Sequence, residues 1–160
     1  MRFSRTNRTG CFATRFGLWI GSLLLLSACQ NAGINGAPLP EELWATRFCV
    51  ERQPRDRRDL GVEIAESLRG AGIDAYSSDV GKCRDESGYR VTYVDNWAWD
   101  MRTYLSKMLI EVTDLSTDEI VAYGESHQDS FAGLGLSFRD VIDRAVSAMF
   151  PENVENEGAH

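Results

Sequence analysis

The sequence predicts an α+β fold, a two-layer sandwich in which two helices lie on one face of a mixed or antiparallel sheet of about five strands. Residues 41–151 alternate strand-like and helix-like patterns in the order β-α-β-β-β-β-α. The strand segments are rich in β-branched and aromatic residues, and each helical segment is apolar along one stripe. Because two helices cannot cover both faces of a five-stranded sheet, we expect both on the same face. The 160 residues are enough for one such domain.

The first half of this domain reads as strand, helix and strand. Residues 44–52 (WATRFCVER) predict the first strand. Asp56 or Asp59 can cap the helix that follows, and Gly70 with Gly72 ends it. Residues 73–80 (IDAYSSDV) then form the next strand. The apolar stripe of the helix consists of Leu60, Ile64, Leu68 and Ala71.

The second half predicts three consecutive strands and a closing helix. The strand segments are YRVTYVDNW, TYLSKMLIEVTDL and EIVAYGES, with a turn at DLSTD. Ser137 and Asp140 resemble a capping box, and Pro151 ends the helix. Residues 152–160 are acidic, and we expect them to be a disordered tail. The stripe of this helix consists of Phe138, Val141, Ile142, Ala145, Val146 and Met149.

The N-terminal segment predicts an export signal. Residues 1–15 contain four arginines and no acidic residue, and residues 16–28 (FGLWIGSLLLLSA) are apolar. Thirteen helical residues rise only about 20 Å, whereas the hydrocarbon core of a bilayer is about 30 Å thick. A basic start, a short apolar run and small residues at its end are typical of a secretory signal peptide.

The end of that signal resembles the lipobox of bacterial lipoproteins, carried by Leu26, Ser27, Ala28 and Cys29. The resemblance implies that residues 1–28 are removed and that Cys29 becomes an acylated N-terminus, which anchors the chain in membrane lipid. In this family, an Asp directly after the cysteine implies retention in the inner membrane. The residue here is Gln30, so the resemblance implies the periplasmic face of the outer membrane. The alternatives are a simple secretory signal with an incidental Cys29, or a buried helix. The Gly-, Asn- and Pro-rich residues 29–40 predict a flexible tether.

The charge balance argues against a nucleic-acid partner. The whole chain has a formal net charge of −7. Without residues 1–28, 13 basic and 24 acidic residues remain, which is a net charge of −11. Such a surface repels phosphate backbones, so we expect no binding of DNA or RNA.

The two cysteines of the domain, Cys49 and Cys83, are expected to form a disulfide. An export signal places them in an oxidising compartment. In the chain-entropy model, a disulfide that closes the loop from residue 49 to residue 83 stabilises the fold by about 4 kcal/mol. Two separate buried thiols are the main alternative. A zinc site would need further closely spaced ligands, which these cysteines lack, and we expect neither a metal nor a cofactor.

Residues 89–149 resemble a family of uncharacterised small bacterial lipoproteins, through YVDNWAWDMRTYL, IEVTDLSTDEIVAYGES and the closing amphipathic helix. More loosely, strand, D-x-x-T turn, strand and helix are similar to the curli-secretion-lipoprotein type of periplasmic domain. The resemblance implies an envelope location and a fold of this shape. It implies no catalytic residues.

Three segments are candidate contact sites. Trp97 and Trp99 in WAWD share one face of a strand, and they either form an aromatic platform for a ligand or close the edge of the core. His127, near Asp129, could act as a general base but is more typical of a solvated loop. The four arginines of residues 52–59 could contact anionic head groups or an acidic partner, or pair with their own Asp56 and Asp59.

These features predict a membrane-anchored envelope lipoprotein that serves as a non-enzymatic binding or accessory module for an envelope protein. The alternative is a small periplasmic ligand-binding or hydrolytic domain that uses His127 and Asp129, or Trp97 and Trp99. A third hypothesis is a subunit of a ring-like secretion assembly, which rests only on the loose similarity of fold.

Overall fold

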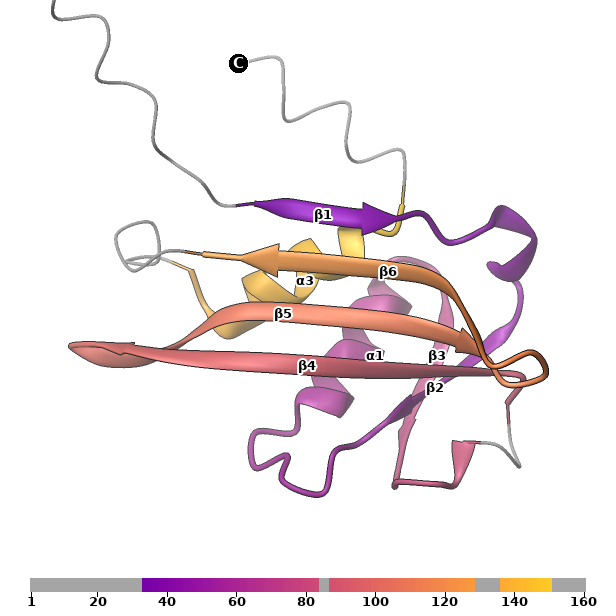
Figure 1. Ribbon diagram of the computed structural model, residues 1–160, viewed down its shortest axis with the longest axis horizontal. Coiled ribbons are helices and arrows are strands. Elements are labelled where there is room, and N and C mark those ends of the chain that lie inside the picture. The colour runs from indigo at the N-terminus through magenta and orange to yellow at the C-terminus, as the bar shows by residue number, and fades with distance from the viewer. Residues whose placement is uncertain (1–32, 84–86, 129–135, 151–160) are drawn as a thin grey trace, which may run out of the picture. The chain divides into compact units, whose positions relative to one another are not determined.

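The computed structural model describes residues 33–83, 87–128 and 136–150, which form a mixed sheet with two helices on one face (Figure 1). The strand order is β1-β6-β5-β4-β2-β3. The strands are β1 (Ile34–Ala37), β2 (Arg47–Glu51), β3 (Asp74–Ser78), β4 (Tyr89–Asp100), β5 (Arg102–Asp114) and β6 (Glu119–His127). The helices are α1 (Leu60–Gly70) and α3 (Phe138–Ser147), with a short 3-10 helix η1 (Glu41–Leu43). The α+β class is therefore confirmed, and the described sheet has six strands rather than about five.

The additional strand, β1, lies within the segment that the sequence predicts as a tether. It pairs antiparallel with the edge of β6, and Gly36 lies opposite Gly124. A Cβ atom on Gly36 would lie 2.6 Å from the carbonyl oxygen of Ala148, so the missing side chain lets the chain pass close to the end of α3. The composition that suggests flexibility, rich in Gly and Asn, thus also permits a tightly packed edge strand.

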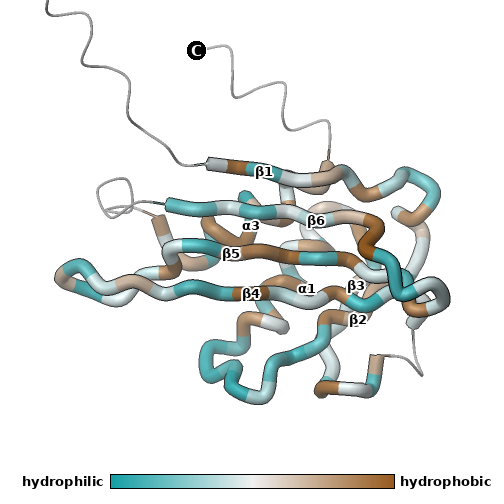
Figure 2. Tube along the Cα trace, viewed as in Figure 1, coloured by the Kyte–Doolittle hydropathy of each residue, from teal (hydrophilic) through white to brown (hydrophobic). Residues whose placement is uncertain are grey.

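Both helices pack on the same face of the sheet and against each other (Figure 1). Helix α1 connects β2 to its parallel neighbour β3, and α3 lies across β5 and β6. The closest approach is at Gly124, where a Cβ atom would lie 1.8 Å from the carbonyl oxygen of Ala145. Hydrophobic residues of β5 run through the middle of the sheet (Figure 2). The largest fully buried side chains are Phe48, Ile64, Leu68, Leu105, Met108, Ile110, Ile142 and Met149.

The ends of both helices are explained by local chemistry. The Ser137 hydroxyl accepts a hydrogen bond from the Asp140 amide, and the Asp140 carboxylate accepts one from the Ser137 amide, so the expected capping box is present. Helix α1 ends in a Schellman motif, because Gly72 has φ 90° and the Ile73 amide donates to the carbonyl of Leu68.

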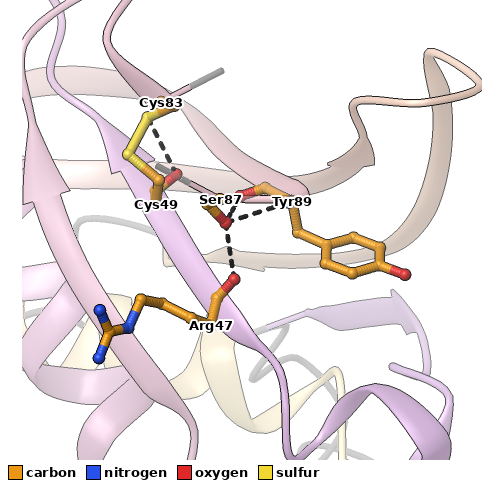
Figure 3. Close-up of a disulfide and its surroundings, with 5 residues drawn as sticks. All are labelled: Arg47, Cys49, Cys83, Ser87 and Tyr89. Atoms are coloured by element: carbon orange, nitrogen blue, oxygen red, sulfur yellow. Dashed lines mark hydrogen bonds between the residues drawn. A yellow bond between two sulfur atoms is a disulfide. The ribbon is translucent and has the colours of Figure 1, made fainter. Parts of the chain in front are cut away.

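The disulfide between Cys49 and Cys83 is present, with the two Cα atoms 5.4 Å apart (Figure 3). Cys49 lies on β2 between the core residues Phe48 and Val50, so its side chain points to the opposite face of the sheet. Nearby, the Ser87 hydroxyl donates to the carbonyl of Arg47 at 2.6 Å and accepts from the Tyr89 amide at 3.1 Å (Figure 3). These bonds hold the start of β4 against β2. Within the described residues, no helix is long and apolar enough to cross a membrane.

Candidate functional site

Strands β4 and β5 extend beyond the rest of the sheet as a two-stranded hairpin (Figure 1). The last row of residues that includes β6 joins His127, Lys107 and Asn96. Beyond this row, β4 and β5 are the only described strands that pair, and their pairing continues to Asp100 and Arg102. We call residues 99–102 the hairpin tip.

Trp97 and Trp99 lie on the same face of β4 but in different environments. Trp97, at the base of the hairpin, is half-buried and packs against the core, as the core-closing interpretation predicts. Its indole N–H donates to the Asp95 carboxylate at 2.6 Å. Trp99, by contrast, is 76% exposed, and Met101 at the turn is 89% exposed. The tip therefore presents two large apolar side chains that the domain does not cover.

Residues 52–59, which we call the arginine loop, pack against the base of this hairpin. The guanidinium carbon of Arg58 lies 3.8 Å from the centroid of the Trp97 ring. The backbone amide of Gln53 donates to the Tyr93 hydroxyl at 3.2 Å. The Tyr93 hydroxyl in turn donates to the Asp56 carboxylate at 2.9 Å. The structure thus brings together two segments that the sequence presents as separate candidates.

Asp56 is the residue that organises the arginine loop. Its carboxylate accepts hydrogen bonds from the amides of Arg58 and Gly61, both at 3.0 Å. Asp56 thereby caps the start of α1, whereas Asp59, the other expected cap, has φ 55° and makes no side-chain cap bond. Burial by itself would raise the pKa of Asp56, but the amide hydrogen bonds outweigh it and hold the pKa below its usual value.

Tyr93 is a member of this cluster that the sequence analysis did not single out. Burial, with a further contribution from the Asp56 carboxylate, raises the pKa of its hydroxyl above the usual value. The hydroxyl therefore stays protonated and donates to Asp56. In the sequence, Tyr93 is one of several aromatic residues in a predicted strand, so no local signal marks it as the partner of a loop about 40 residues earlier.

The arginine loop, the hairpin tip and the start of β1 lie at the same end of the sheet (Figure 1). Arg52 pairs with Asp79, so it is engaged within the domain. Arg55, Arg57 and Arg58 are exposed. This end therefore combines exposed arginines with the exposed apolar residues of the hairpin tip.

His127 is not part of this cluster. His127 pairs with Lys107, which pairs with Asn96, and this row is next to the row of Met108. Neighbouring rows point to opposite faces of the sheet, and Met108 faces the core. His127 therefore lies on the face opposite Trp97 and Trp99. Its Nε2 accepts a hydrogen bond from the Gly33 amide at 3.2 Å. A Cβ atom on Gly33 would lie 1.8 Å from the imidazole ring. The ring thus packs against the start of β1. Asp129, its expected companion, lies outside the described residues.

A shallow cleft of about 510 Å³ lies between α1 and α3. Its charged lining is paired, since Arg139 forms ion pairs with Glu63 and Glu66. The Ser67 hydroxyl donates to Asp143 at 2.6 Å. Hydrogen bonding and the charge of Glu63 raise the pKa of Arg139. Nowhere in residues 33–83, 87–128 and 136–150 do three His, Cys, Asp or Glu side chains gather in a geometry that could hold a metal ion.

The second face of the sheet carries none of the described helices. Alternation along β4, β5 and β6 places a set of apolar and charged side chains on it, which we call the open sheet face. Val94 is 50% exposed there, and Lys107 forms an ion pair with Glu125 at 2.8 Å. The open sheet face comprises Thr92, Val94, Lys107, Leu109, Glu111, Tyr123 and Glu125.

No protein-family model and no curated protein matches this sequence. Solved structures do share its fold. A PelC dodecamer from Paraburkholderia phytofirmans is 15% identical with a TM-score of 0.58, and the match covers 74% of this chain and 98% of that chain. A second crystal form of PelC gives a TM-score of 0.56. A minor lipoprotein from Acinetobacter baumannii is 14% identical with a TM-score of 0.34 and matches over 74% of this chain and 95% of its own. At such identities the likeness to PelC shows the fold alone.

Proposed function

We propose that the chain is a lipid-anchored module of the bacterial envelope that acts, without catalysis, as a binding or accessory surface for an envelope protein. The observation that carries the proposal is the open sheet face, a broad surface of strands β4, β5 and β6 that none of the described helices covers. A small domain with one face covered by helices and a second face that carries none of the described helices has a surface available for a partner.

The anchor is the first part of the proposal. The four residues of the lipobox-like segment end at Cys29, and Gly33, where the described chain begins, is the fourth residue after it. Acylation of Cys29 would hold the domain close to the membrane surface, because four residues span at most about 14 Å. With Gln30 in second position, the outer membrane and its periplasmic face are the proposed location.

The chemistry of the open sheet face suits a protein partner. Val94, Leu109 and Tyr123 provide apolar and aromatic contact area, and Tyr is enriched at the cores of protein interfaces. Beside them, the ion pair of Lys107 with Glu125 supplies charges that can orient such contacts. Apolar centres within a charged rim are the usual anatomy of a protein interface.

The hydrolytic or ligand-binding alternative has less support. His127 accepts the Gly33 amide through Nε2 and is packed against that glycine, which leaves this nitrogen occupied. Trp97 and Trp99 lie on the other face of the sheet, and Trp97 is engaged by Asp95 and Arg58. His127 and the two tryptophans thus do not converge, and Asp129 lies outside the described residues.

A second candidate partner is another copy of the chain. PelC, whose fold this chain shares over 98% of the PelC length, was solved as a dodecamer. Assembly through the open sheet face or through the edge strands β1 and β3 would make the chain a subunit of a ring. Native mass spectrometry of the detergent-solubilised protein distinguishes a monomer with a foreign partner from a homo-oligomer.

Site-specific photo-crosslinking in intact cells tests the proposal. A photoreactive phenylalanine analogue at Val94, in the open sheet face, is expected to capture one abundant envelope protein. The same analogue at Glu66, which is exposed on α1, is the matched control and is expected to capture none. A Cys29→Ala chain should lose the crosslink. Equal capture from both positions, or none from either, would contradict the assigned surface.

A further inference from the structure

We infer that the end of the domain that carries the hairpin tip docks onto the membrane that holds the chain's own anchor. In this arrangement Trp99 and Met101 enter the head-group region of the bilayer, and the arginine loop faces anionic lipid head groups. The inference deepens the proposed function and rests on its lipidation of Cys29. The partner of this surface is a phospholipid bilayer. The test below distinguishes a bilayer from a protein bound at the same place.

The hairpin tip is built to present apolar side chains away from the domain. Trp97 is held by Asp95 and Arg58, which fixes the base of the hairpin and directs Trp99, two residues further along the same face, into solvent. Met101 adopts φ 58°, a left-handed conformation that is unfavourable for a residue with a Cβ and that Gly or Asn adopts more easily. The Met101 side chain is 89% exposed and so is available for a contact outside the domain.

The strand register places the hairpin tip and the start of β1 at the same end of the sheet. Ile34, the first residue of β1, lies in the row of Ser126, Met108 and Asp95. From Asp95 the hairpin continues by six residues to Met101, which is about 20 Å at the rise of a strand. Cys29 precedes Ile34 by five residues, which span at most about 18 Å. By covalent geometry this segment is long enough for the acyl chains of Cys29 and the hairpin tip to contact the same bilayer.

Exposed guanidinium groups at this end are available to bind anionic head groups. Arg55, Arg57 and Arg58 are exposed there, in a mature chain whose overall net charge is −11. An arginine near an anionic membrane surface is attracted to it electrostatically. Asp56 and Asp59 of the same loop and Asp95 and Asp100 of the hairpin also lie at this end, so the positive charge is that of the exposed guanidinium groups and not a net excess. Tryptophan beside basic residues is the composition found at bilayer interfaces.

Fluorescence quenching in the acylated protein tests the inference. The full mature chain is purified from membranes, its acylation is confirmed by mass, and it is reconstituted into phosphatidylethanolamine–phosphatidylglycerol vesicles with or without brominated lipids. We expect bromolipid to quench a component of the tryptophan emission that is shielded from aqueous iodide. That component should be lost in Trp99→Phe, which keeps an aromatic ring, and should weaken in Met101→Asp.

A tryptophan at the opposite end of the sheet provides the matched control. Ile120 is 56% exposed near the start of β6, beside the turn that joins β5 to β6 and far from the hairpin tip. Ile120→Trp in the Trp99→Phe background should respond to iodide and not to bromolipid. The inference would be overturned if bromolipid quenched wild type and Trp99→Phe equally and if iodide quenched Trp99.

The two proposals fail in distinguishable ways. A purified chain without acyl groups, or one that does not float with vesicles, would contradict the lipid anchor itself. A chain that is acylated and floats, but whose Trp99 emission is shielded only in native membranes and not in vesicles, would overturn bilayer docking and point to a protein at the tip.

Discussion

Arg58 stacks on Trp97, with its guanidinium carbon 3.8 Å from the centroid of the indole ring. The contact joins the arginine loop, which precedes α1, to the base of the β4-β5 hairpin. Two further bonds support it, from the Tyr93 hydroxyl to Asp56 and from the Trp97 indole to Asp95. The loop and the hairpin therefore form one rigid end of the domain, which is the end that we propose faces the membrane.

Removal of the Arg58 guanidinium should weaken the domain slightly. A cation–π contact at an exposed site contributes about 0.5–1 kcal/mol, so Arg58→Ala should lower the free energy of unfolding by that amount. Arg57→Ala, an exposed neighbour in the same loop, is the control and should change it by less than about 0.5 kcal/mol. Urea unfolding followed by circular dichroism measures both. Equal losses in the two variants would show that the stacking is not stabilising.

Asp56 should make the domain sensitive to acid. Its pKa in the folded state is below the usual value, so its contribution is complete above the unfolded value of about 3.9 and is lost as pH falls through the folded pKa. We expect Asp56→Asn to be less stable than wild type at pH 6, and the difference between the two to shrink toward pH 3. Urea titrations at each pH measure it. Asp79, Asp114 and Asp140 also have lowered pKa values but are common to both proteins.

The Cys49–Cys83 disulfide should stabilise the domain substantially. Removal of a link that closes a loop of this length costs about 4 kcal/mol in the chain-entropy model. The double variant Cys49→Ala, Cys83→Ala should therefore unfold at much lower urea concentration. Intact mass before and after reductant should differ by about 2 Da in wild type, for the two hydrogens that reduction of the bond adds. An unchanged mass would show that the thiols are free.

Gly124 should tolerate no side chain. A Cβ atom there would lie 1.8 Å from the Ala145 carbonyl oxygen, so Gly124→Ala must push α3 away from β6. Overpacking of this kind costs about 1–3 kcal/mol or more. Gly70→Ala is the matched control, because a Cβ atom meets nothing within 4 Å at that helical position. It should stabilise the domain by up to about 1 kcal/mol. Thermal unfolding of the two variants should shift in opposite directions.

Features that depend on local chemistry could be predicted from the sequence. The apolar stripes gave the positions of α1 and α3, and the Ser137–Asp140 capping box and Gly72 marked helix ends that the structure confirms. The pairing of Cys49 with Cys83 followed from the compartment that the signal implies. These inferences require only neighbouring residues or a count of cysteines.

Features that depend on distant contacts could not be predicted. Residues 34–37 form β1 only because β6 offers an open edge and because Gly36 lets the chain pass close to the end of α3. The contact of Arg58 with Trp97 requires the parallel placement of β2 beside β4, which no local pattern specifies. Likewise, alternation showed that Trp97 and Trp99 share a face. That Trp97 is half-buried and Trp99 exposed depends on how far the core of the folded domain extends along that face.

The mass of the mature N-terminal peptide tests the central proposal, a lipid-anchored domain, most directly. The protein is extracted from membranes of its native host, digested, and the peptide that contains Cys29 is sequenced by mass spectrometry. We predict a chain that begins at Cys29 and carries acyl groups on its sulfur and its α-amine. A chain that begins elsewhere, or an unmodified Cys29 in a protein released without detergent, would contradict the anchor and with it the proposed membrane docking of Trp99.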